Sequence, residues 1–242
     1  MKKLNKEVFL NVIANCTLLL LVIFVFGVAF IPKNVTESFK KDTVNPYYNG
    51  DKNKKQVSLM FNVYENSEVV NSILDVLKEN KVKSTFFIGG SWAVKNGETL
   101  KRIVSEGHEI GNHGYSHKDH DKLDYQGNEK EINLSEVVIY ALSGIKTNLF
   151  APPSGAFDKT TLKVCEEKGY KVIMWSKDTI DWRDHDKTLV FKRATENLEN
   201  GDFVLMHPKT HTLSALQEIL DYYKNNGFSL VTVSENIQGV VV

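Results

Sequence analysis

Hydrophobic residues along most of the chain follow two alternating patterns, one typical of strands and one of helices. Short apolar runs are followed by segments with apolar residues at helical spacing, such as Val70, Ile73, Leu74 and Leu77. The runs predict strands at residues 57–62, 83–88, 108–112, 149–152, 170–175, 203–206 and 229–233. The helical spacing predicts helices at residues 69–80, 99–106, 129–142, 159–168, 187–198 and 213–226.

Strands that alternate with helices favour a parallel sheet with helices packed outside it. About seven such units around one core predict an α/β fold, a distorted (β/α) barrel that is closed or nearly closed. Polar residues that follow strands of such a barrel lie together on one rim. This rim is expected to carry Asn62, His113, residues 151–154, residues 178–182 and His207.

The first part of the chain has a different pattern. Lys2, Lys3 and Lys6 precede an apolar stretch at about residues 8–31, which is long enough to span a bilayer. We interpret residues 1–31 as a retained single-pass transmembrane helix, with a cleaved signal peptide as the alternative. In both cases the domain is exported, so we expect it outside the cell membrane, tethered or secreted.

The remaining chain is expected to consist of a polar linker at residues 32–55 and a folded domain at residues 56–237. The 242 residues contain 30 basic and 30 acidic side chains, so no overall charge attracts nucleic acid. Cys16 lies in the apolar segment and Cys165 in a predicted helix, so the fold does not depend on a disulfide between them. No protein partner is indicated.

Three histidines, His113, His117 and His120, follow one predicted strand at spacings of four and three. Imidazoles at this spacing can converge on one divalent metal ion, with zinc as the expected ion and an open position for water. The alternative is a polar surface loop that carries histidines. We favour the metal site.

His207 ends another apolar strand, and Asp181 lies beside Trp182 after a different one. A carboxylate near His207 would favour the protonated imidazole, which suits a proton donor to a leaving group. The alternatives are an ordinary strand-end histidine and an ordinary turn.

Several motifs resemble those of NodB-type polysaccharide deacetylases, carbohydrate esterase family 4. The sequence GHEIGNHGYSH at residues 107–117 resembles the metal-binding histidine motif of this family, DTIDW at 178–182 its Asp-Trp motif, and LMHP at 205–208 its C-terminal motif. KSTFFIG at residues 83–89 also fits. The resemblance covers residues 56–237 and implies a NodB-homology domain that removes N-acetyl groups from an envelope amino-sugar polymer such as peptidoglycan.

The resemblance also implies roles for single residues. A divalent metal held by the histidines would polarise the N-acetyl carbonyl and its bound water. His207, supported by Asp181, would protonate the departing amine, and Leu205 would line the pocket for the acetyl methyl group. Trp182, Ser154 and Asn62 would contact the glycan.

Three positions depart from the family. Asn62 and Val63 stand where the family has two aspartates, a general base and a metal ligand, and Ala151 stands where it has an arginine that braces the base. We hypothesise that His120 replaces the lost ligand and completes a three-histidine zinc site. The alternative is that His120 points away and the site has decayed.

Two main functions therefore remain open. We favour a metal-dependent N-deacetylase, because a decayed site has no chemical reason to keep His207 with its carboxylate. The alternative is a catalytically degenerate, membrane-tethered glycan-binding protein of the same fold. A hydrolase of this fold that acts on another amide or ester is a third candidate.

Overall fold

The computed structural model describes residues 15, 17, 20, 21 and 45–240. Apart from the first four of these positions, the predicted anchor at residues 1–31 lies outside the described residues. No helix in the described part of the chain has the length and apolar character needed to cross a membrane. The contacts divide the chain between Asp42 and Thr43, and the second unit contains the sheet with its helices.

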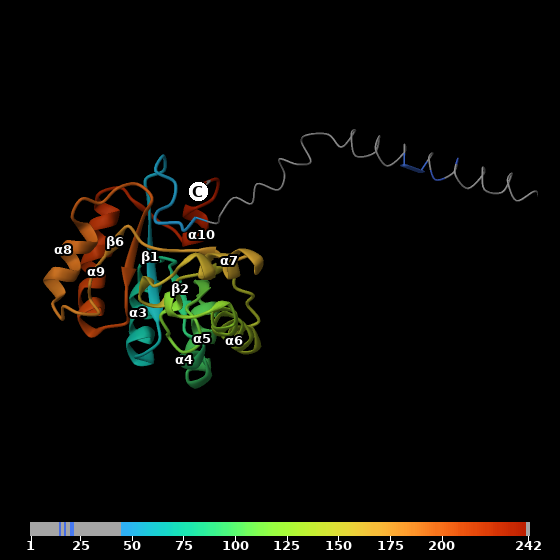
Figure 1. The fold of residues 1–242 in the computed structure, drawn as a ribbon. Helices are drawn as coiled ribbons and strands as arrows, with labels where there is room; N and C mark the ends of the chain where they lie inside the picture. The colour runs from blue at the N-terminus through green and yellow to red at the C-terminus, as the bar shows by residue number, and fades with distance from the viewer. Residues whose placement is uncertain (1–14, 16, 18–19, 22–44, 241–242) are drawn as a thin grey trace, which may run out of the picture. The chain divides into compact units, whose positions relative to one another are not determined.

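The centre of this unit is a sheet of eight strands (Figure 1). They are β1 (Gln56–Val63), β2 (Thr85–Ile88), β3 (Glu109–Asn112), β4 (Leu149–Phe150), β5 (Lys171–Val172), β6 (Lys177–Asp178), β7 (Asp202–Met206) and β8 (Ser229–Leu230). The order is β5-β4-β3-β2-β1-β7-β6, with β8 paired to β1, and all named pairs are parallel. The path ends at β5 and β6, so the predicted parallel α/β architecture is confirmed as a half-barrel rather than a closed barrel.

Helices cover the sheet. They are α3 (Ser67–Glu79), α4 (Gly90–Lys95), α5 (Gly97–Ser105), α6 (Tyr125–Ser143), α7 (Lys159–Glu167), α8 (Lys187–Thr195), α9 (Thr210–Asn225) and α10 (Val233–Asn236). The six predicted helices are all present within a few residues of their expected bounds. The strand expected at residues 229–233 ends early, because Thr232 and Glu235 form a capping box that starts α10.

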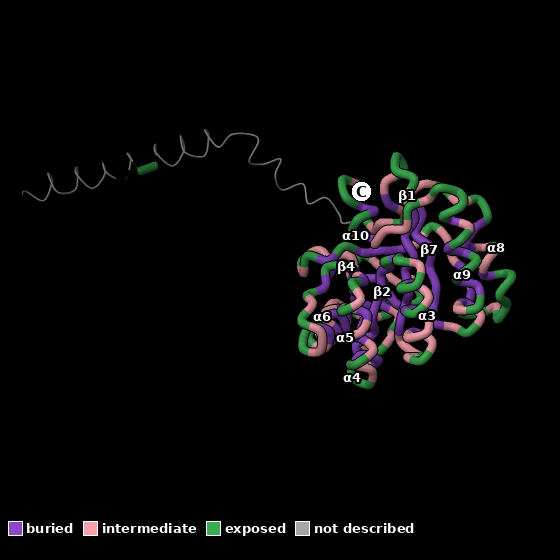
Figure 2. Tube along the Cα trace, turned by 180° about the vertical axis from the view of Figure 1, so that it is seen from behind, coloured by how far each residue is buried: buried purple, intermediate pink, exposed green. Residues whose placement is uncertain are grey.

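The alternation of side chains along β1 divides the core into two parts. One buried cluster lies between the sheet and the helices. It contains the fully or almost fully buried side chains of Val57, Leu59, Phe61 and Val63. Met60 points to the other face, where it belongs to a second buried cluster with Phe87, Phe203 and Leu205. Figure 2 shows the central strands β1, β2 and β7 as mostly buried backbone. Asn62 follows Met60 by two residues, which places its side chain on this inner face, at the carboxyl end of the strand.

The predicted linker is shorter than expected. Tyr47 forms a parallel bridge with Ile173, and Asn49 forms an antiparallel bridge with Asp202. The backbone N–H of Gly50 donates to the carbonyl of Gly201 at 2.7 Å. Residues 47–51 therefore belong to the folded domain, because their backbone groups pair with it instead of with water.

Candidate active site

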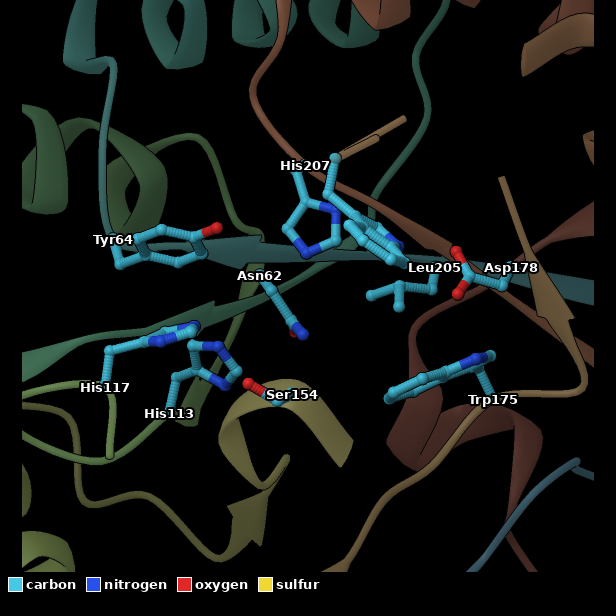
Figure 3. A pocket seen from close by; sticks show the side chains of 10 residues that line it. Asn62, Tyr64, His113, His117, Ser154, Trp175, Asp178, Leu205 and His207 are labelled. Atoms are coloured by element: carbon cyan, nitrogen blue, oxygen red, sulfur yellow. The ribbon is translucent and has the colours of Figure 1, made fainter. Parts of the chain in front are cut away.

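A cavity opens at the carboxyl ends of the strands, where the sequence predicted a functional rim (Figure 3). Each side chain comes from the end of a strand or the loop that follows it. The lining residues are Asn62, Tyr64, His113, His117, Ser154, Trp175, Asp178, Trp182, Leu205 and His207. The structure thus brings together seven of the nine predicted site residues; Asp181 lies behind His207, and His120 lies elsewhere.

His113 and His117 form one wall of the cavity, with ring centroids 5.1 Å apart. The fully buried His113 ring donates from Nδ1 to the carbonyl of Ala151 at 2.7 Å, so Nε2 carries the lone pair. This Nε2 has no hydrogen-bond partner in the described structure. Burial lowers the pKa of His113 well below its usual value, and the charge of His117 lowers it further, so the ring is neutral.

His120 does not join these two histidines, which corrects the three-histidine hypothesis. Its buried ring bonds through Nδ1 to the side chain of Asn128 on α6 at 2.6 Å and packs edge-on against Phe150. His117 has a left-handed backbone with φ of 56°, after which the chain turns, and His120 starts a 3₁₀ turn docked against the helices. His120 is therefore a core histidine.

The three positions that depart from the family do not supply a carboxylate that could act as the third metal ligand instead of His120. Val63 is fully buried in the cluster on the helix side of β1, facing away from the cavity. Asn62 faces the cavity, and its Oδ1 is buried without a partner among the described residues. Ala151 is part of the inner apolar cluster, so no charge is available there to brace a base.

The donor atoms of the cavity do not fit the metal site that the resemblance implies. His113 and His117 supply two neutral nitrogens, whereas catalytic zinc takes three protein ligands. Within residues 45–240 and the four described positions before them, no three His, Cys, Asp or Glu side chains are grouped to hold a metal ion. The predicted three-histidine zinc site is therefore wrong for this structure.

His207 lies across the cavity from these histidines and is held by Asp181. The His207 ring donates from Nδ1 to Oδ1 of Asp181 at 2.7 Å, and its backbone N–H donates to Oδ2 at 2.7 Å. The Thr212 hydroxyl adds a bond to Oδ2 at 2.7 Å. Burial would raise the pKa of the Asp181 carboxyl, but the bonds and charge of His207 outweigh burial and hold the pKa below its usual value.

Apolar and aromatic side chains complete the cavity. Leu205 is only 2% exposed and lies next to His207, whereas Trp182 is 49% exposed. Ser154 lies in the 3₁₀ turn η2 (Pro153–Gly155) with φ of 56°. The next residue is Gly155. A Cβ at this position would lie 2.7 Å from the Trp175 ring, so glycine allows the loop to pack closely against Trp175.

Tyr64 and Trp175 also line the cavity, and Thr212 bonds to Asp181, although none of the three was predicted from the sequence. Tyr64 continues the two-residue alternation of Met60 and Asn62, and this signal would have placed it at the cavity. Thr212 gave no such signal, because it lies on α9 and reaches Asp181 only through the packing of α9 against that loop.

Comparison with known proteins agrees with the fold and with the family that the sequence motifs indicate. The model of the polysaccharide deacetylase family matches residues 49–173. The chain belongs to this family. Deacetylases of the family are generally metal-dependent, so the donor set of this cavity departs from them.

Two curated relatives illustrate the range of the family. The chain is 35% identical to the uncharacterized protein YlxY of Bacillus subtilis over 78% of its own length and 60% of the relative. It is 32% identical to a peptidoglycan-N-acetylglucosamine deacetylase of Bacillus cereus, over 87% of the chain and 82% of that protein. The match to the first of these relatives thus spans less than two thirds of the length of that protein.

Among solved structures, a pseudoenzyme of carbohydrate esterase family 4 from Bacillus anthracis superposes with a TM-score of 0.78 at 34% identity. The match covers 80% of this chain and 69% of that one. A mutant of that pseudoenzyme with restored enzymatic activity superposes equally well, with a TM-score of 0.78 at 32% identity. The same fold therefore occurs with and without catalysis.

Proposed function

We propose that this protein is an N-deacetylase of a cell-envelope polysaccharide of the peptidoglycan type, a hydrolase that acts on a non-peptide carbon–nitrogen bond. The observation that carries the proposal is the oriented pair of His207 and Asp181, which faces the same cavity as the neutral rings of His113 and His117. The relative named as a peptidoglycan-N-acetylglucosamine deacetylase supports this substrate class.

The chain's own residues suggest how the N-acetyl bond is cleaved. The lone pair of His113 Nε2 accepts a hydrogen bond from a water molecule as this water attacks the acetyl carbon, and the water gives its proton to solvent. The bond between carbon and nitrogen then breaks, and Nε2 of protonated His207 gives its proton to the departing amine. Asp181 keeps the His207 ring oriented through Nδ1. The products are acetate and a free amino sugar, and solvent returns the proton to His207.

A second candidate is a catalytically degenerate protein that binds the glycan in this cavity. The specific observation in its favour is that Asn62 cannot accept a proton near neutral pH and that Val63 faces the helices. The likeness to a pseudoenzyme at 34% identity points in the same direction.

Acetate release from an N-acetylglucosamine tetramer and from purified peptidoglycan separates the two candidates. The purified full chain is compared with His207→Ala, and binding of the same tetramer is measured in parallel. Release by the wild type that His207→Ala abolishes supports the deacetylase. Binding without acetate release supports the degenerate protein, and neither binding nor release contradicts both.

We also propose that the domain lies outside the cell membrane and that the N-terminal segment anchors it there, with secretion after cleavage as the alternative. The proposal is supported by Lys2, Lys3 and Lys6 before the long apolar stretch. Cell fractionation and protease treatment of intact cells test the location. Mass spectrometry of the N-terminus then distinguishes the anchored protein from the cleaved one.

A further inference from the structure

Tyr64 is the aromatic residue directly after β1, and its ring lies among the histidines of the cavity. Its ring centroid is 4.0 Å from that of His117, 6.1 Å from that of His113 and 6.2 Å from that of His207. Figure 3 shows the hydroxyl end directed toward His207. Tyr64 thus lies between the two histidine groups that a bound acetyl group would contact.

The loop that carries Tyr64 is fixed to the loop after β7. Glu65 forms an ion pair with Lys209, and the Asn66 side chain donates to the carbonyl of Pro208 at 3.1 Å. On the other side of Tyr64, the Val63 carbonyl accepts a bond from the backbone of Gly89 at 2.8 Å. With both flanks held, the ring is placed before any ligand arrives.

The Tyr64 hydroxyl has no hydrogen-bond partner among residues 45–240. Burial raises the pKa of this phenol, and the charge of Glu65 raises it further, so the group remains a neutral donor near neutral pH. His113 already uses its Nδ1 proton on the Ala151 carbonyl. The chain also lacks the arginine of the family motif, since Ala151 is there. An acceptor that enters the cavity near His207 therefore meets Tyr64 as a free donor.

We propose that the Tyr64 hydroxyl hydrogen-bonds the carbonyl oxygen of the N-acetyl group, and that Tyr64 thereby selects acetylated over deacetylated sugars. The proposal rests on the proposed function, because it assumes that an N-acetylated glycan enters this cavity. It holds for a deacetylase and for a glycan-binding protein, since both must recognise the same group.

The test compares the affinities of an N-acetylglucosamine tetramer and a glucosamine tetramer for the full chain. Trp175 and Trp182 line the cavity, so quenching of tryptophan fluorescence reports binding within seconds, before much acetate forms. Tyr64→Phe keeps the ring against His117 and removes only the hydroxyl. Tyr140→Phe makes the same chemical change at a position on α6 that is 58% exposed and outside the cavity.

Loss of one neutral hydrogen bond corresponds to an affinity about 3- to 10-fold weaker. We expect Tyr64→Phe to weaken binding of the acetylated tetramer by this factor, with binding of the glucosamine tetramer unchanged. Tyr140→Phe should match the wild type for both. If Tyr64→Phe binds the acetylated tetramer within twofold of the wild type, the inference is wrong, while the proposed function stands. If the wild type binds neither tetramer, the proposed function fails and the inference with it.

Discussion

Asp181 holds His207 by two bonds, one from the backbone N–H and one from the ring Nδ1, both 2.7 Å long. The two bonds fix the position and the tautomer of the ring together, and Nε2 is left to face the cavity. Thr212 donates a third bond to the same carboxylate. A buried carboxylate with this set of donors is an orienting group for a proton donor.

Asp181→Asn tests this role. The substitution replaces one carboxylate oxygen with an NH₂ group. This donor then faces the N–H or O–H groups that now donate to Asp181, so at least one of these hydrogen bonds is lost. We expect acetate release to fall about 100-fold or more, in the range of lost acid–base catalysis. Initial rates of acetate release measure the effect.

Thr212→Val is the matched control for Asp181→Asn. It removes one hydrogen bond from the carboxylate and leaves the contact with His207, so we expect a smaller fall in rate and a stability loss of about 1 kcal/mol. Equal rates for Asp181→Asn and the wild type would contradict the orienting role.

Asn62→Asp is expected to increase hydrolysis. Asn62 faces the cavity, and its Oδ1 has no partner among the described residues, so a carboxylate there is free to take a proton from water. We expect acetate release to rise about 10-fold or more. Val63→Asp is the contrasting variant, because its carboxylate would be buried against the helices and should lower stability by several kcal/mol. An Asn62→Asp variant without any gain in rate would show that base strength does not limit the reaction.

His120→Ala should affect stability and leave the cavity unchanged. Its buried ring bonds to Asn128 and packs on Phe150, so we expect a loss of about 2 kcal/mol in the free energy of unfolding. Glycan affinity should remain as in the wild type. After equilibration with zinc and dialysis, neither protein should retain about one zinc per chain, since two histidines do not complete the site. Zinc retained by the wild type and lost in His120→Ala would restore the three-histidine hypothesis.

His108 is expected to make the domain sensitive to acid. The buried ring accepts a bond from the backbone N–H of Ser84 at 3.2 Å. Burial, followed by the charge of Lys83, lowers its pKa from 6.5 to about 4. Between these values the unfolded chain binds more protons than the folded one, so the free energy of unfolding falls as pH drops below 6.5 and levels off below about 4.

Urea unfolding at pH 7 and pH 5 measures this effect. The contribution of His108 to the loss between these two values is about 2 kcal/mol. His113, His117 and His120 also have lowered pKa values, so the wild type loses more than this amount. His108→Gln keeps an acceptor for Ser84 and does not titrate, so the difference between the variant and the wild type isolates His108. An identical loss in both proteins would contradict the assignment.

Much of the fold could be predicted because its signals are local. The apolar spacing of Val70, Ile73, Leu74 and Leu77 follows from one helix turning one face to the core, and these four residues are the buried side of α3. The short strand β6 and the short helices α4 and α10 were not predicted. Each has only a few residues, so none of them repeats a period often enough to be recognised.

The cavity was predicted in part for a related reason. The ends of parallel strands meet on one rim, so His113 and His207 could be placed together from strand order alone. The direction of the His120 side chain could not be predicted in this way. It depends on the turn at His117 and on the hydrogen bond to Asn128 of α6.

The sequence by itself thus determined the parallel α/β architecture, the rim and the motifs that place the chain among polysaccharide deacetylases, because periodicity and spacing are properties of neighbouring residues. Only the tertiary structure decided that Val63 faces the helices, that His120 is a core residue and that Tyr64 lies between His117 and His207. These relationships join segments far apart in the chain, and they are set by how the packed elements fill space, which no local pattern encodes.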